Sequence, residues 1–116
     1  MNLKVLKPSR RWLKVGDVFA MLPPDDLFVY GRIIANDAIA IPGHKGILAY
    51  VFSARSRVLH EVPELSRDHL LIPPFITNRL GWSRGYFQHV ETTALGSDDR
   101  LPQHCFRHFP GEIIAE

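Results

Sequence analysis

The chain has 116 residues, of which 46% are hydrophobic and 22% are charged. This length suits one domain, and the apolar fraction favours a folded core over disorder. Cys105 is the only cysteine, which excludes an intrachain disulfide and favours a reducing, cytoplasmic compartment. No run approaches the roughly 20 apolar residues of a membrane-spanning helix. The basic start of the chain has no apolar stretch behind it, unlike a signal peptide.

The formal net charge of +2 is unevenly distributed along the chain. Residues 1–60 contain nine Lys or Arg against four acids, whereas residues 61–116 contain five against eight. The first 14 residues carry no acid and five basic side chains, which are Lys4, Lys7, Arg10, Arg11 and Lys14. Nucleic-acid-binding domains usually carry a larger excess, because their affinity comes from neutralising many phosphates. We therefore interpret the basic start as a solvated strand with its flank.

Turn-forming residues divide the chain at short, regular intervals, among them Asn36-Asp37, Pro42-Gly43 and Gly81. The runs between them are rich in Val, Ile, Phe, Tyr and Leu, which predicts strands. In chain order, the predicted strands are a weaker one at 3–6, then 17–22, 27–35, 46–53, 70–76, 82–91 and 113–115. Short helical turns are predicted only at 63–70 and 76–80. No linker divides the chain, so a single domain over residues 1–116 is expected.

Two of the predicted strands are apolar on both faces. In the strand at 27–35, Val29 and Ile33 alternate with Tyr30 and Ile34, so both faces should be covered. The strand at 46–53 has the same pattern. Gly31 interrupts the first strand, and a glycine there commonly marks a bulge or a bend. The sequence therefore predicts a mostly-β fold: a single small, strongly bent antiparallel sheet or partly open barrel with one or two short helical turns.

Several segments taken together resemble a known family. They are GDVFAMLPPDDLFVYGRII at 16–34, LLIPPFITNRLGWSRGYFQHV at 70–90 and HCFRHF at 104–109. This set is similar to the immunity protein 26 family of bacterial polymorphic toxin systems, over about residues 14 to 109. The resemblance implies a mostly-β protein that protects its producer by binding a toxin. It implies neither the identity of the toxin nor any particular binding residue.

The sequence contains no motif that predicts an enzyme. It has no glycine-rich phosphate loop, no GxSxG and no HExxH. Cys105 follows His104, but neighbouring residues in a strand point to opposite faces, so His104 would not activate the thiol. With one cysteine and no CxxC, a metal site is not expected. We therefore predict that the chain is not an enzyme and needs no cofactor.

An arginine and aromatic set provides the candidate binding residues. On the predicted strand at 82–91, Trp82, Arg84 and Tyr86 would share one face. Arg79 precedes them and Arg32 follows Tyr30. Trp, Tyr and Arg are the residues most enriched at interface hot spots. The alternative is that Trp82 and Tyr86 belong to the core, with Arg84 extending to the surface.

The favoured function is an immunity protein that binds a cognate toxin domain and neutralises it by occlusion. The alternative function is a small nucleic-acid-binding β-barrel module, which would use the basic N-terminal segment and exposed aromatic side chains. The favoured partner is a protein, with nucleic acid disfavoured and no membrane involved.

Overall fold

The computed structural model describes residues 3–41, 44–96, 99, 105–108 and 112–115. The elements in chain order are β1 (Asp17–Met21), β2 (Phe28–Ile41), β3 (His44–Ser56), β4 (Phe75–Thr77), α1 (Leu80–Ser83), β5 (Gln88–Thr92), β6 (Cys105–His108) and β7 (Glu112–Ala115). Among the described residues, no helix is long and apolar enough to cross a membrane.

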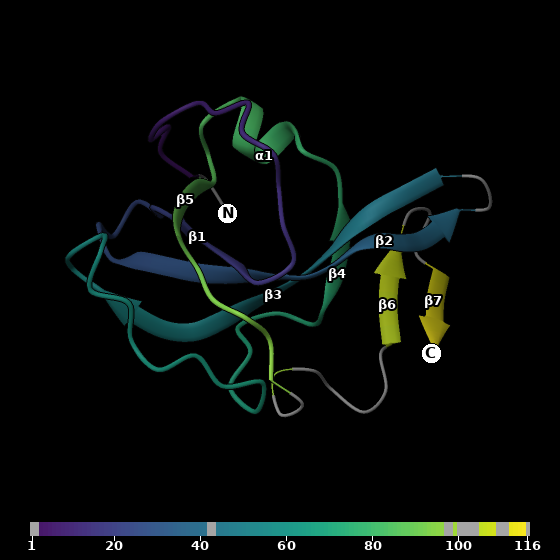
Figure 1. Cartoon of the computed structure of the whole chain (residues 1–116). Helices are drawn as coiled ribbons and strands as arrows, with labels where there is room; N and C mark the ends of the chain where they lie inside the picture. Colours follow the sequence, from purple (N-terminus) through teal and green to yellow (C-terminus); the bar gives the residue numbers. More distant parts are fainter. Residues whose placement is uncertain (1–2, 42–43, 97–98, 100–104, 109–111, 116) are drawn as a thin grey trace.

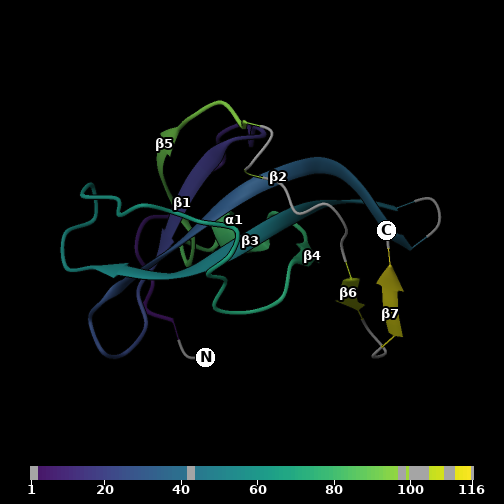
Figure 2. The same ribbon diagram turned by 90° about the horizontal axis from the view of Figure 1, so that it is seen from below.

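Five strands form one antiparallel sheet in the order β4-β3-β2-β1-β5, and β6 and β7 form a separate two-stranded sheet. The long β2 and β3 strands curve along their length (Figure 2). Their pairing shifts register at several points, including one between Val29 and Gly31. The main sheet does not close on itself, since β4 and β5 remain its two edges. The predicted mostly-β, bent and open sheet is confirmed.

The main sheet is covered on both faces, as the apolar alternation predicted. We call one layer the helix-side core: Leu13, Phe19, Met21, Val29, Ile33, Ala49, Val51 and Trp82. We call the other the loop-side core: Val18, Ala20, Tyr30, Ile34, Leu48, Tyr50 and Phe52. The strands β1, β2 and β3 contribute alternate residues to the two layers, because successive side chains point to opposite faces.

Irregular segments provide much of the cover on each face. The N-terminal segment (residues 3–16) and α1 lie on one side of the sheet, and the connection from β3 to β4 lies on the other (Figure 1). Leu59, Val62 and Leu65 of that connection pack against the loop-side core. The Tyr30 hydroxyl donates to the carbonyls of Val58 and Leu59, at 2.9 and 3.0 Å. These hydrogen bonds hold the connection from β3 to β4 against the sheet.

The hairpin formed by β2 and β3 is longer than the sequence predicted. Asn36-Asp37 does not form a turn but lies inside β2. The pairing with β3 shifts between Ala35 and Ala38, so an irregularity in the ladder accommodates the two polar residues. The pairing continues to Ile41 and His44. The predicted Pro42-Gly43 turn lies outside the described residues.

The region from 70 to 92 differs most from the prediction. The strand expected at 70–76 is reduced to β4, and Leu70 forms only an isolated bridge with Phe52. The strand expected at 82–91 begins as α1 and becomes extended only at Gln88. Gly85 separates the two parts with a φ of +86°, a conformation that breaks a strand and favours glycine.

The remaining short elements agree only in part with the sequence prediction. The strand expected at 3–6 is a single bridge between Lys4 and Leu22. The segment at 63–70 forms a turn, in which the His69 amide donates to the Ser66 carbonyl. The helical turn expected at 76–80 is wrong, because residues 76 and 77 end β4 and the helix α1 begins only at Leu80. The strand expected at 113–115 is present as β7.

Gly31 is required for packing rather than for an unusual backbone. It pairs with Phe19 across β1 and β2, and its φ lies outside the left-handed region. A Cβ built on Gly31 would lie 2.3 Å from the Cζ atom of Phe19, whose side chain is fully buried. The glycine therefore leaves room for the Phe19 ring to lie against the strand.

We expect Gly31→Val to destabilise the protein by about 1–3 kcal/mol, because the added atoms overpack against the fully buried ring of Phe19. Urea unfolding of the variant and the wild type measures this difference. Gly96→Val is the matched control, since the nearest atom to its built Cβ is 3.5 Å away. Equal midpoints for Gly31→Val and the wild type would contradict the packing role.

Candidate functional site

The N-terminal segment lies over the helix side of the sheet and is held by backbone hydrogen bonds. The Leu6 amide donates to the Gly85 carbonyl at 2.7 Å, and the Ser9 amide donates to the Trp82 carbonyl at 2.9 Å. Further along, Leu13 is buried while its neighbours Trp12 and Lys14 are exposed. The segment therefore places Leu13 in the helix-side core, packs the partly buried Leu3 against that core, and presents Trp12 and Lys14 to solvent.

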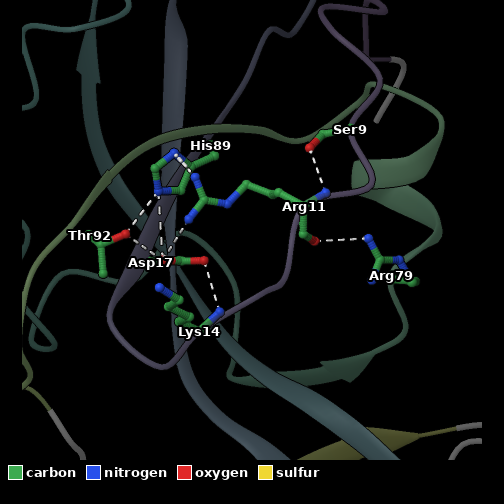
Figure 3. Close-up of polar contacts among 7 residues, drawn as sticks. All are labelled: Ser9, Arg11, Lys14, Asp17, Arg79, His89 and Thr92. Carbon is green, nitrogen blue, oxygen red and sulfur yellow. Dashed lines mark hydrogen bonds and ion pairs between the residues drawn. The ribbon is translucent and has the colours of Figure 1, made fainter.

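Asp17 holds the end of this segment against the sheet. Its side chain is 1% exposed. The Lys14 amide donates to Oδ2 at 2.9 Å, and the Thr92 hydroxyl donates to Oδ1 at 2.6 Å (Figure 3). The Arg11 Nη2 atom lies 3.9 Å from Oδ1. A buried carboxylate needs such partners, because removing it from water without them is costly.

His89 joins the same cluster in a defined tautomer. Arg11 Nη1 lies 3.0 Å from Nδ1 of His89, and Nε2 lies 3.0 Å from the Thr92 hydroxyl oxygen. Because arginine can only donate, Nδ1 must accept and Nε2 must carry the proton. Burial lowers the pKa of His89 below its ordinary 6.5, and the Arg11 cation lowers it further, while the nearby Asp17 carboxylate opposes both. The imidazole is therefore neutral at pH 7.

The cluster of Asp17, Arg11, His89 and Thr92 holds its members in fixed orientations but is poorly arranged for acid–base catalysis. The Thr92 hydroxyl donates its proton to Asp17 and accepts one from Nε2 of His89. His89 therefore has no lone pair facing Thr92 with which to activate it as a nucleophile. Among the described residues, no group of three or more His, Cys, Asp or Glu side chains could hold a metal ion. The geometry indicates a structural role for the cluster.

A groove opens beside the cluster, with a volume of about 370 Å³. Its lining comes from the N-terminal segment, β2, β3, the end of β4 and the stretch between β4 and α1: Trp12, Leu13, Asn36, Gly46, Ile47, Thr77, Asn78 and Arg79. Trp12 is 79% exposed. Trp12 is not among the binding residues predicted from the sequence, although it lies inside the basic N-terminal segment.

Arg79 forms part of the groove wall and is held in place by the N-terminal segment. Its Nη2 donates to the Arg11 carbonyl at 3.1 Å (Figure 3). Its Nε lies 3.4 Å from the Ser83 hydroxyl, and the residue nevertheless remains exposed. Asn78 fixes the same stretch, because its Oδ1 accepts the Leu80 amide proton at 2.9 Å.

The structure separates the five candidate binding residues into two groups. Arg79 and Arg84 are exposed and flank α1 at its two ends, and Tyr86 is half-buried. The expectation that Trp82, Arg84 and Tyr86 share one strand face is wrong, because α1 and the turn at Gly85 replace the strand. Arg79, Arg84 and Tyr86 stay predicted contact residues.

Trp82 lies in the core instead of on the surface. Its side chain is 0% exposed. Its ring centroid is 4.9 Å from that of Phe19 and 4.9 Å from that of Phe87, with edge-to-face geometry in both pairs. Aromatic pairs favour this arrangement. The alternative that placed Trp82 in the core is therefore the one observed.

Arg32 also offers little surface to a partner. Its side chain is 10% exposed. Nη1 lies 3.3 Å from the Asp99 carboxylate, and Nη2 donates to the carbonyls of Thr93 and Ala94, both at 3.1 Å. These contacts hold the chain that follows β5 against β2. The geometry supports a structural role for Arg32.

The chain is similar to one family of known proteins. The model of the family described as Immunity protein 26 matches residues 14–110. No curated protein and no solved structure matches the chain. The matched range covers β1 to β6 and includes Asp17, His89 and Thr92. It also includes every groove-lining residue except Trp12 and Leu13.

We expect Trp82→Ala to cost about 3–5 kcal/mol of stability, because it leaves a cavity beside Phe19 and Phe87. Arg84→Ala should change stability by less than about 0.5 kcal/mol, since the side chain is exposed. Thermal melting distinguishes the two. If the alanine variant does not fold, Trp82→Phe serves instead, because it keeps an aromatic ring and should lose less stability. A wild-type melting temperature for Trp82→Ala would contradict its core position.

The pH dependence of stability should reveal the lowered pKa of His89. The unfolded chain takes up a proton near pH 6.5, before the folded chain does. The contribution of neutral His89 is therefore fully present above that pH and is lost as the pH falls below it. Urea unfolding is measured between about pH 5.5 and 8. As the pH is lowered, the free energy of unfolding should fall less in His89→Gln than in the wild type. Parallel curves for the two proteins would refute this assignment.

Proposed function

Because the chain belongs to the immunity protein 26 family, we propose that it binds a cognate polymorphic toxin and neutralises it by occlusion, without catalysis. The family match over residues 14–110 is the observation on which the proposal rests. The matched range includes the sheet, α1 and most of the groove.

The geometry supports binding by a preformed surface. The exposed groove is bordered by a segment that Asp17 fixes to the sheet and by an arginine whose guanidinium is held by a backbone carbonyl. A surface that is already ordered before association loses less conformational entropy on binding. Stoichiometric occlusion needs no cofactor, because affinity alone neutralises the toxin.

The proposed site of action is the cytoplasm. The support is the single cysteine, Cys105, because secreted domains of this size usually carry paired cysteines. The partner in this proposal is a protein, the cognate toxin domain.

The stoichiometry of neutralisation tests the proposal. The toxin domain encoded beside the gene for this chain is purified, and its activity is titrated with increasing amounts of the chain. We expect inhibition to be complete at one equivalent, with a Kd of roughly nanomolar or tighter. Co-expression of the chain should also restore growth to cells that produce the toxin.

Two results would contradict the proposal. If neither inhibition nor complex formation occurs, the chain is not the immunity factor for that toxin. If a small fraction of one equivalent inactivates the toxin progressively with time, the chain acts as a catalyst and occlusion is wrong. Heat-unfolded chain is the control for non-specific inhibition.

A further inference from the structure

The most exposed large apolar side chain on the helix side of the molecule is Trp12, at 79%. Val5, Val15 and Leu80 are also exposed, at 58%, 37% and 47%. All four belong to the N-terminal segment or to α1, which hydrogen bonds join to each other. An exposed apolar side chain that stands alone needs no explanation, but Trp12 also lines a groove.

The groove beside Trp12 combines an apolar floor with a polar rim. Leu13 and Ile47 provide apolar lining, and Asn36, Thr77 and Asn78 provide hydrogen-bonding groups. The volume of about 370 Å³ lies at the small end of the range for ligand pockets. It suits one or two inserted side chains rather than a whole domain.

The charge around the groove is predominantly positive. Arg10 and Lys14, two residues before and two residues after Trp12 in the chain, are exposed. Arg79 is an exposed lining residue, and it bonds the carbonyl of Arg11, the residue before Trp12. Asp37, which follows the groove residue Asn36, is an exposed acid nearby. The positive charge therefore lies on the side of Trp12 and Arg79, where a carboxylate would be attracted and could be bound by planar guanidinium donors.

We propose that this groove is the toxin-docking surface, and that it takes a segment of the toxin with an apolar anchor flanked by acidic side chains. This inference rests on the proposed immunity function. The anchor packs against Trp12 and the groove floor. An adjacent carboxylate of the toxin pairs with Arg79, whose position is fixed by the Arg11 carbonyl.

A protein segment fits this surface better than a nucleic acid does. Single-stranded nucleic acids are bound by several aromatic side chains along a positive track. Trp12 is the one tryptophan, tyrosine or phenylalanine among the groove-lining residues, and Arg79 is the one lysine or arginine among them. An isolated aromatic side chain beside an apolar pocket and an arginine is typical of a protein hot spot.

The test uses the full chain and the toxin domain encoded beside its gene. Trp12→Ala and Arg79→Glu should each weaken binding at least about tenfold while the melting temperature stays within about 2 °C of the wild type. Binding is measured by biolayer interferometry. Raising NaCl from about 50 to 500 mM should slow association of the wild type more than that of Arg79→Glu.

Matched controls come from the other side of the sheet. Val58→Ala changes an exposed apolar side chain (49% exposed) and Arg57→Glu reverses an exposed arginine, both on the connection after β3. Both controls should bind the toxin as the wild type does. A labelled single-stranded oligonucleotide of about 12 nucleotides provides a second probe for the wild type and for Trp12→Ala.

The outcomes separate the docking surface from the function itself. If the wild type binds the toxin and both groove variants bind equally well, the inference is wrong and the proposed function stands. Selective loss in the Val58 or Arg57 controls would place the interface on the opposite face. Micromolar oligonucleotide binding that Trp12→Ala removes, without any change in toxin binding, would overturn the inference in favour of a nucleic acid. If the wild type does not bind the toxin, the proposed function fails and the inference fails with it.

Discussion

The buried carboxylate of Asp17 joins three parts of the chain that are distant in sequence. It accepts hydrogen bonds from the Lys14 amide at the end of the N-terminal segment and from the Thr92 hydroxyl at the end of β5. Arg11 lies close enough to balance its charge and also donates to His89. Since a carboxylate that is 1% exposed cannot rely on water, these partners must stay in place. This one polar group therefore links the edge of the sheet to the N-terminal segment, in addition to the backbone hydrogen bonds that hold the segment.

The need to cover both faces of the sheet explains why the candidate surface lies where it does. Antiparallel sheets often leave one face in water, but β2 and β3 carry apolar side chains on both faces. The N-terminal segment helps to cover the helix side by burying Leu13, and the neighbouring Trp12 is thereby directed to solvent. One short segment thus contributes to the core and to the proposed docking surface. A substitution in it should be judged by the face on which its side chain lies.

The aromatic cluster of Phe19, Trp82 and Phe87 has a related role on the same face. The rings pack at centroid distances of 4.9 to 5.0 Å, and their packing fixes α1 against β1. Two glycines permit this arrangement. Gly31 leaves space for the Phe19 ring, and Gly85 turns the chain after α1 with a positive φ. Because α1 carries Arg79 and Arg84 at its two ends, the core packing also positions the exposed arginines.

The sequence by itself determined the mostly-β class, the two-faced central strands and the family resemblance, because each depends on local order: strand alternation, turn residues and motif spacing. It also identified Arg79 as a candidate. The sequence could not decide whether Trp82 lies on the surface or in the core. The same residues are compatible with a strand that exposes the Trp82 ring and with a helix that buries it. Only the tertiary structure decided between them, through the space beside Phe19 and the turn at Gly85. The tertiary structure likewise showed that Trp12 is exposed and that Asp17 is buried among polar partners. Exposure and side-chain pairing depend on which distant segments of the chain come into contact, and the spacing of residues along the sequence does not give those contacts.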